Sequence, residues 1–181
     1  MYGIVNKSIE ELIKHHHGNE KWDAILKRSG VDTDFFISNQ PYDDAITYQL
    51  AGAVSEELGV TVGDVLFLFG EWWILHTTKQ KYGNLLQAGG KSLREFLINL
   101  PVFHNHIMMM YPKLTPPEFK VSEVQENSIQ VHYFSKRVGL QSFVHGLLSG
   151  LSKLYETETQ IALMQSRDDG ADHEIFKVSW N

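Results

Sequence analysis

The chain has no cysteine, and this absence excludes two kinds of site. Without thiols the protein cannot build a disulfide framework or a thiolate metal centre, and it fits a reducing compartment. Long apolar runs are also missing. No stretch approaches the roughly 18 residues of a membrane-spanning helix, and the start, "MYGIVNKSIEELIKHHHG", has no basic head followed by a long apolar core. We therefore expect a soluble, cytoplasmic protein that does not enter a membrane.

Basic residues are too few to form a nucleic-acid-binding surface. Sixteen Lys and Arg stand against 22 Asp and Glu, and no basic block offsets the formal net charge of −6. Aromatic residues are plentiful at 12%, which favours a bulky core or a pocket for a flat apolar ligand. Because the 181 residues contain no repeat, low-complexity tract or linker, we expect a single domain over 1–181.

Hydrophobic spacing predicts helices in the first part of the chain and strands in the second. Helices are expected over 3–17, over a segment ending near Gly30, over "YDDAITYQLAGAVSEELG" and over "TVGDVLFLFGEWWILHTTK". Four later segments alternate with a period of two: "FKVSEVQ", "SIQVHYFSKR", "TQIALMQSR" and "HEIFKVSW". The helical "LQSFVHGLLSGLSKLY" divides them into two pairs. The pattern predicts an α+β fold, with an N-terminal helical subdomain and then a four-stranded antiparallel sheet with one inserted helix.

A histidine lies on the apolar face of the helix that precedes the strands. In "KSLREFLINLPVFHNHIMMMYP", Ser92 and Glu95 have the spacing of a capping box. The apolar stripe that follows comprises Leu93, Leu97, Leu100, His104, Ile107 and Tyr111. His106 lies about 200° further round the helix, on another face, and Pro112 is expected to end the helix. His104 is then a hydrogen-bonded core residue, an axial haem ligand or, if exposed, a phosphoacceptor.

Three further patterns each have a structural and a functional interpretation. Strand alternation in "YFSKR" places Tyr133, Ser135 and Arg137 on one side, where they face solvent or bind a pair of carboxylates such as the two propionates of haem. The step Thr115-Pro116-Pro117 is a rigid connection or aims a proline ring at a cofactor. The "HHH" at 15–17 favours a solvated helix end over a metal site, since successive helical residues point about 100° apart.

The ordered set of motifs resembles the haem-nitric oxide/oxygen binding (H-NOX) family, which includes the haem domain of the soluble guanylate cyclase β subunit and stand-alone bacterial proteins. The similar stretches are "MYGIVNK", "YDDAITYQL", "LFGEWW", "LREFLINLPVFHNH", "MYP", "PPEF", "HYFSKRVGLQ" and "HEIFKV". The resemblance implies a haem between the helical subdomain and the sheet, with His104 as proximal ligand. It also implies that Tyr133, Ser135 and Arg137 bind the propionates and that Pro117 presses on the haem and distorts it. With no cysteine for covalent attachment, the cofactor is expected to be haem b.

The resemblance also implies a distal pocket for a gas. We expect its walls to include Ile4, Trp73, Phe143 and Leu147. Oxygen-binding members of the family carry a tyrosine on the helix after the propionate-binding motif, and Phe143 aligns with that position. Because oxygen gains from a donated hydrogen bond that nitric oxide does not need, an apolar pocket favours nitric oxide. The indole N–H of Trp73 is a donor, which keeps an oxygen sensor open as an alternative.

The implied function is sensing rather than catalysis. Nitric oxide, and also CO, would bind ferrous haem, and nitric oxide would break the bond between iron and His104. The released helix would then signal to a partner. No kinase or cyclase sequence follows residue 181, so the expected partner is a histidine kinase or diguanylate cyclase on a separate chain. Two other classes remain: a haem enzyme using His76 or His145 as distal acid or base, and a cofactor-free interaction or phosphotransfer domain with His104 exposed.

Overall fold

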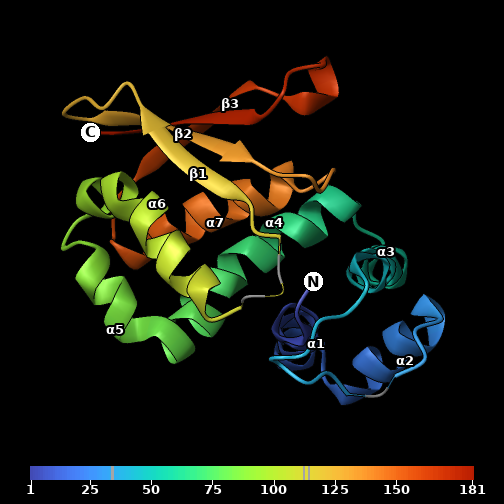
Figure 1. Cartoon of the computed structure of the whole chain (residues 1–181). Helices are drawn as coiled ribbons and strands as arrows, with labels where there is room; N and C mark the ends of the chain where they lie inside the picture. The colour runs from blue at the N-terminus through green and yellow to red at the C-terminus, as the bar shows by residue number, and fades with distance from the viewer. Residues whose placement is uncertain (34, 112, 114) are drawn as a thin grey trace. The chain divides into compact units, whose positions relative to one another are not determined.

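Helices come first along the chain and a β-sheet comes later (Figure 1). The computed structural model describes residues 1–33, 35–111, 113 and 115–181. The helices are α1 (Gly3–His17), α2 (Asn19–Ser29), α3 (Asp44–Leu58), α4 (Val62–Trp72), the π-helix η1 (Trp73–Thr78), α5 (Lys79–Gly89), α6 (Leu93–Met109), α7 (Gln141–Leu154) and the 3-10 helix η2 (Arg167–Asp169). The strands are β1 (Glu118–Ser122), β2 (Ser128–Phe134), β3 (Thr159–Gln165) and β4 (Glu174–Trp180). The chain divides into two compact units, Met1–Phe69 and Gly70–Asn181, so the prediction of one domain stays a prediction.

The N-terminal unit is built from α1, α2, α3 and the start of α4. Its helices end where the sequence predicts, and the glycines that follow α2 and α3, Gly30 and Gly59, adopt left-handed conformations with φ of 68° and 67°. The buried apolar side chains of α1 to α3 include Ile9, Leu12, Ile13, Trp22, Ile25, Leu50 and Val54. These side chains repeat at helical spacing, so each helix places one apolar stripe in the core.

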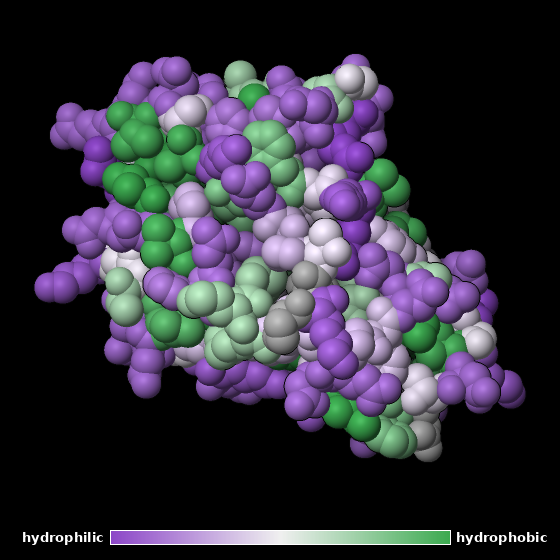
Figure 2. Space-filling view, viewed as in Figure 1, coloured by the Kyte–Doolittle hydropathy of each residue, from purple (hydrophilic) through white to green (hydrophobic). Residues whose placement is uncertain are grey.

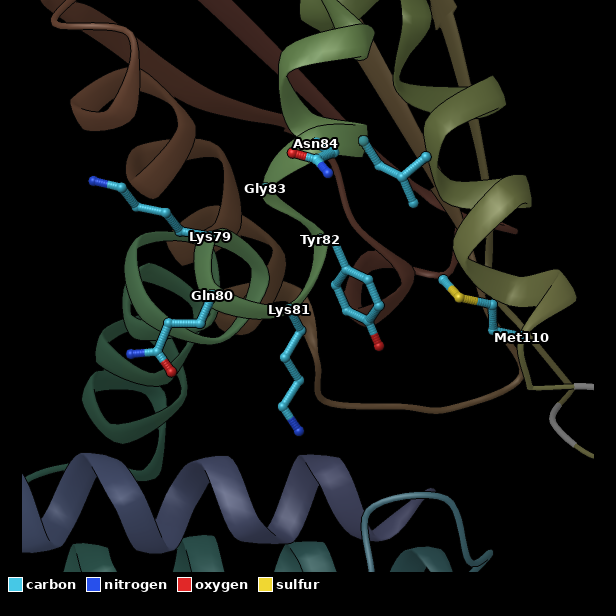
Figure 3. A pocket seen from close by; sticks show the side chains of 8 residues that line it. Lys79, Gln80, Lys81, Tyr82, Gly83, Asn84 and Met110 are labelled. Carbon is cyan, nitrogen blue, oxygen red and sulfur yellow. The ribbon is translucent and has the colours of Figure 1, made fainter.

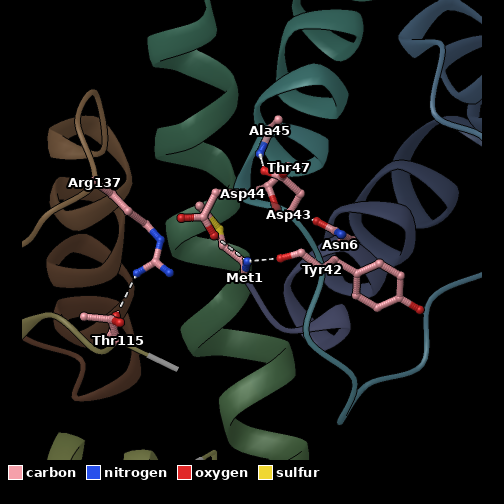
Figure 4. A network of polar contacts seen from close by, with 9 residues as sticks. All are labelled: Met1, Asn6, Tyr42, Asp43, Asp44, Ala45, Thr47, Thr115 and Arg137. Atoms are coloured by element: carbon pink, nitrogen blue, oxygen red, sulfur yellow. Dashed lines mark hydrogen bonds and ion pairs between the residues drawn. The ribbon is translucent and has the colours of Figure 1, made fainter. Parts of the chain in front are cut away.

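Polar contacts fasten the first residues of this unit to the start of α3 (Figure 4). The amino group of Met1 donates to the carbonyl oxygen of Tyr42 at 2.6 Å and pairs with the carboxylate of Asp44. Deeper in the unit, the Thr47 hydroxyl donates to the side-chain oxygen of Asn6 at 2.6 Å. Both residues are buried, so this bond is shielded from competing water.

The C-terminal unit contains the whole sheet. Its strands run in the order β1-β2-β4-β3, and each neighbouring pair is antiparallel. Helix α7 lies between β2 and β3 in the chain. This is the predicted α+β arrangement of a helical subdomain followed by a four-stranded antiparallel sheet with an inserted helix, and that prediction is confirmed.

The two faces of the sheet differ in polarity, as period-two alternation requires. The inner face contributes Phe119, Ile129, Val131, Tyr133, Phe176 and Val178 to a buried cluster that also holds residues of α6 and α7. Figure 1 shows both helices on that side of the sheet. The outer face carries Lys120 and His132, and the His132 ring shares a 2.9 Å hydrogen bond with His173.

No single helix among the described residues is both long and apolar enough to cross a membrane; only the bent pair formed by 44–58 and 62–89 passes by length and composition together. Figure 2 shows apolar surface in separate patches between hydrophilic side chains.

Helices α4 and α7 approach each other closely at Gly70. A Cβ added there would lie 2.3 Å from the carbonyl oxygen of Phe143 and 2.7 Å from the backbone nitrogen of Leu147. Both neighbours are backbone atoms, which cannot move aside as a flexible side chain can. Glycine at position 70 is therefore what lets these two helices pack at this distance.

Gly70→Ala should lower the free energy of unfolding by roughly 1–3 kcal/mol, because overpacking outweighs the better helix propensity of alanine. Gly83→Ala is the matched control in α5 of the same unit. A Cβ there would meet no described atom outside the local helix backbone within 4 Å, so the change should be neutral or stabilising by up to about 1 kcal/mol. Urea unfolding monitored by circular dichroism measures both variants. Equal free energies of unfolding for the two variants would show that α4 and α7 can move apart without a loss of stability.

Candidate functional site

Helix α6 carries His104 against the inner face of the sheet. The helix begins as predicted: the Ser92 hydroxyl accepts a hydrogen bond from the backbone N–H of Glu95 at 3.2 Å, and the Glu95 carboxylate accepts one from the backbone N–H of Lys91 at 2.8 Å. The other stripe positions within the helix are buried, namely Leu93, Leu97, Leu100 and Ile107. The predicted apolar face is therefore confirmed up to Ile107.

Two prolines bear on the length and strength of α6. Pro112, which was predicted to end the helix, lies outside the described residues, and the last helical residue is Met109. Pro101 lies inside the helix, three residues before His104, and the sequence analysis gave it no role. Because proline has no N–H, it cannot donate the helical hydrogen bond to the carbonyl of Leu97. The turn just before His104 therefore has one backbone hydrogen bond fewer than a regular helical turn.

Among the described residues, the side chain of His104 lacks the hydrogen bond that a core histidine would have at its Nδ1. Its Nδ1 is buried and has no hydrogen-bond partner in the described part of the chain. Its ring meets the Phe119 ring edge-on, with centroids 5.0 Å apart. Burial lowers the pKa of His104 to about 4, so the imidazole is neutral near pH 7 and has a lone pair to offer. A buried polar atom left unpaired costs about 1–3 kcal/mol, which a bound group could recover.

The second histidine of the motif has a different environment. His106 is exposed, whereas His104 is only partly so. A phosphoacceptor needs an exposed ring, and a core histidine needs satisfied nitrogens; His104 meets neither requirement well. The geometry therefore favours the ligand interpretation for His104.

The Phe119 ring lies between His104 and Tyr133, the first residue of the predicted propionate-binding motif. The Phe119 ring, which contacts His104, also lies 5.3 Å from the Tyr133 ring between centroids. Tyr133 faces the inner side of β2 and is 4% exposed. One side of the sheet thus brings a strand residue of the motif close to the helix that carries the histidine.

The rest of the motif lies beyond the strand. β2 ends at Phe134, so the prediction that the strand continues through Ser135 to Arg137 is wrong, and a shared side for these two residues and Tyr133 stays a prediction. The chain bends instead, because the Ser135 hydroxyl accepts a 3.0 Å hydrogen bond from the backbone N–H of Arg137, a local bond that competes with the ladder. Gly139, with φ of 72°, completes the bend before α7.

The Arg137 guanidinium reaches the segment that precedes β1. Its Nη1 donates to the carbonyl oxygen of Thr115 at 3.1 Å (Figure 4). Pro116 is exposed and Pro117 is partly buried, so Pro117 is the proline that contacts the interior. The structure thereby links two of the predicted patterns, "TPP" and "YFSKR", through one arginine.

Three of the predicted distal residues lie together in the C-terminal unit. The rings of Trp73 and Phe143 meet edge-on with centroids 6.5 Å apart, and Leu147 follows Phe143 by one turn of α7. All three side chains are partly buried. Ile4 belongs to the N-terminal unit, where it is 4% exposed, and its place in the pocket stays a prediction.

The helix that bears Trp73 is not the continuous α-helix that the sequence predicts. Residues Trp73–Thr78 form a π-helix, and Tyr82 has non-helical angles of φ −128° and ψ 23°. π-helical turns are frequent at functional sites because they re-aim side chains. The spacing of apolar residues does not distinguish a π-helical turn from an α-helical one, so the π-helix could not be predicted from the sequence.

The histidines required by a haem-enzyme interpretation are engaged elsewhere. The His76 ring stacks on Trp72 with centroids 3.7 Å apart. His145 lies 6.1 Å from the Phe176 ring, on the side of α7 that faces the sheet, and burial lowers its pKa. Phe143, two residues earlier, contacts Trp73 instead, so the two side chains point in different directions.

Two tyrosines that sequence reasoning did not pair lie near the end of α6. The hydroxyls of Tyr82 and Tyr111 are hydrogen-bonded, and burial is the main cause that raises the pKa of Tyr82. A pocket of about 360 Å³ lies beside them, lined by Lys79 to Leu85 and by Met110 (Figure 3). None of the predicted site residues lines this pocket.

The "HHH" segment is the end of α1, as expected. His15, His16 and His17 are exposed, and the rings of the first two meet edge-on at 4.8 Å. Across the described residues, no group of three His, Cys, Asp or Glu side chains is arranged to hold a metal ion. A haem needs one axial side chain, however, and His104 fits that need: its nitrogen is unsatisfied, its surroundings are aromatic, and donors for carboxylates follow in the same unit.

Comparisons with known proteins agree with this site. The family model described as "Haem-NO-binding" matches residues 2–163. Relatives include the soluble guanylate cyclases gcy-31 and gcy-32 of Caenorhabditis elegans. The first is 27% identical over 183 residues, covering all of this chain and 26% of that protein; the second is 30% identical over 156 residues, covering 84% and 23%. The chain therefore spans about a quarter of the length of these cyclases.

Solved structures show the same fold. An H-NOX protein from S. oneidensis in the Fe(II)NO ligation state has a TM-score of 0.89 at 19% identity, with 100% of this chain and 99% of that chain covered. The Fe(II) unliganded H-NOX protein from K. algicida has a TM-score of 0.87 at 25% identity, with 100% and 97% covered. The chain belongs to the haem-NO-binding family, whose H-NOX domains are haem-containing gas sensors.

Proposed function

We propose that the chain binds one haem b through His104 and senses nitric oxide. The observation that carries the proposal is the neutral, partly buried imidazole of His104 with a buried nitrogen that lacks a partner. Bound ferrous haem would supply an iron with one axial site for His104 and the other open to a diatomic gas. The absence of cysteine means that the cofactor has no thioether attachment and that a cysteine-bound zinc is impossible.

The residues around the bend would bind the carboxylates at the polar end of the haem. The Arg137 guanidinium can bind a carboxylate with two parallel hydrogen bonds, and the hydroxyls of Tyr133 and Ser135 can donate to the second. Pro117, partly buried two residues before the Phe119 ring, would press on the haem from the segment held by Arg137.

We attribute selectivity for nitric oxide to the apolar side chains of Phe143 and Leu147 on α7. Phe143 and Leu147 offer no hydrogen bond, and α7 contains no tyrosine. The next tyrosine, Tyr155, donates to the carbonyl oxygen of Gly90 at 3.1 Å. Oxygen, which needs a donor more than nitric oxide does, would therefore bind weakly. Trp73 is the residue on which the alternative of an oxygen sensor depends.

Signalling is assigned to α6. When nitric oxide binds, His104 would leave the iron, and the helix would lose one contact with the site. α6 would still be held by its buried apolar face, by its capping box at Ser92 and by the Tyr82–Tyr111 contact beyond its end. We assign the readout to a histidine kinase or a diguanylate cyclase on a separate chain; a differential affinity of a few kcal/mol is enough to shift such an equilibrium.

His104→Gly should abolish haem retention unless imidazole is supplied, because the proximal ligand is gone, while His106→Ala should retain haem. The absorbance ratio of the Soret band to the protein band after purification, with and without imidazole, measures both. Haem retained equally in the two variants would remove His104 from the proposal.

Arg137→Ala should weaken haem binding by about 2 kcal/mol, or roughly thirtyfold in the dissociation rate, because a charge-assisted hydrogen bond to a carboxylate is lost. Transfer of haem to an excess of a scavenging apo-globin gives this rate. An unchanged rate of haem loss would show that Arg137 does not bind a propionate and that "YFSKR" has only a structural role.

Phe143→Tyr should raise the affinity for oxygen, whereas the unmodified reduced protein should keep its spectrum in air and change it with nitric oxide or CO. The reason is the single hydrogen-bond donor that the phenol adds. Visible spectroscopy under each gas tests the prediction. An oxygen response in the unmodified protein that disappears in Trp73→Phe would identify an oxygen sensor instead.

A further inference from the structure

A second arginine contacts the bend that carries Ser135 and Arg137. Arg167 is the last residue of the predicted strand "TQIALMQSR", but β3 ends at Gln165, and Arg167 instead opens the short helix η2 between β3 and β4. Its Nη1 donates to the backbone carbonyl oxygens of Ser135 at 3.0 Å and Arg137 at 2.8 Å. This nitrogen carries two hydrogens, so it can make both bonds at once.

The two carbonyls lie just beyond the support of the sheet. Pairing between β2 and β4 ends at Tyr133 opposite Glu174, so Ser135 and Arg137 receive no ladder bonds from β4. Arg167 supplies donors where a neighbouring strand no longer does. Together with the bond from the Arg137 N–H to the Ser135 hydroxyl, its two bonds fix the path of the chain through the bend.

Arg167 is itself held by its neighbours. The buried Ser166 hydroxyl accepts from the backbone N–H of Asp168 at 3.1 Å and donates to the side-chain oxygen of Gln141 at 3.0 Å. Gln141 in turn donates to the Asp168 carboxylate at 2.8 Å. Gln141 is the first residue of α7, the helix that also carries Phe143. The bend is thereby tied to α7 as well as to the end of β2.

We propose that Arg167 is a positioning residue for the haem carboxylates: by bonding the two carbonyls of the bend, it holds the side chains of Ser135 and Arg137 ready for the propionates. The inference rests on the proposed function. The role inferred for Arg167 is to order the bend rather than to bind a propionate, since the bonds that it makes from Nη1 go to the backbone. The gain comes from ordering the donors before the ligand arrives, which reduces the entropy lost on binding.

The test compares two porphyrins in Arg167→Met, a variant that keeps the length of the side chain and removes its donors. With haem, the variant should lose its cofactor to a scavenging apo-globin about tenfold faster than the unmodified protein. This corresponds to a tenfold loss of affinity that appears in the dissociation rate. With haem dimethyl ester, which has no carboxylates, the two proteins should lose the porphyrin at the same rate. Combining Arg167→Met with Arg137→Ala should add little to the effect of Arg137→Ala alone.

Arg94→Met is the matched control. Arg94 also donates to a backbone carbonyl, that of Gln125 at 3.1 Å, in the same unit but away from the bend, so haem loss should not change. Arg167→Lys, which keeps a cation with several donor hydrogens, should restore part of the retention and covers the case in which Arg167→Met fails to fold.

Equal acceleration with both porphyrins would show that Arg167 only stabilises the fold, and unchanged haem loss in Arg167→Met would show that it has no role in binding; either result overturns the inference. A thirtyfold effect of Arg137→Ala beside no effect of Arg167→Met would leave the proposed function intact and reject the inference alone. An unmodified protein that retains no haem after gel filtration from added haem would reject both.

Discussion

The site depends on one nitrogen that the protein leaves unsatisfied. Nδ1 of His104 is buried on the inner face of α6, beside the Phe119 ring, without a hydrogen-bond partner among the described residues. The cost of about 1–3 kcal/mol is large for a protein whose total stability is on the order of 10 kcal/mol. Burial keeps the ring neutral, which is the protonation state that a metal ligand requires. A haem bound through this histidine would give the unsatisfied side chain a partner.

The proposed haem also requires an ordered set of hydrogen-bond donors for its carboxylates. In the structure two of the predicted donor residues lie in a bend and not on the face of a strand. The bend after Phe134 turns Ser135 and Arg137 out of the ladder, and hydrogen bonds from Arg167 and to Ser135 fix that turn. Arg137 meanwhile reaches Thr115, next to the two prolines. The parts of the site that lie far apart in the sequence are thus connected through arginines and backbone carbonyls rather than through packing alone.

Sequence reasoning reached the features that repeat with a local period. The capping box at Ser92, the apolar stripe as far as Ile107 and the existence of four strands each follow from spacing, and the structure confirms them. Burial alternates along β2 and β4, whereas β3 has a register shift between Leu163 and Gln165 and is mostly exposed at that end. The π-helix at Trp73–Thr78 was missed because a single widened turn leaves the apolar pattern intact. The end of β2 was missed because "YFSKR" keeps alternating after the ladder stops.

Contacts between distant segments could not be read from the sequence at all. Arg167 is separated from Ser135 by 32 positions, and Tyr82 from Tyr111 by 29, and neither pair has a spacing that marks it. The distal pocket is the reverse case: Trp73 and Phe143 do meet, but whether they and Leu147 line a gas site stays a prediction, since proximity of rings alone does not identify a ligand.

The central claim is that His104 holds the iron, and the resonance Raman spectrum of the reduced protein tests it most directly. The account predicts an iron–imidazole stretching band that shifts when histidine is labelled with ¹⁵N and that is absent from His104→Gly. Added imidazole should restore such a band to the variant without the isotope shift. A labelled-histidine band that persists in His104→Gly, or a haem-loaded protein that never shows one, would contradict the account.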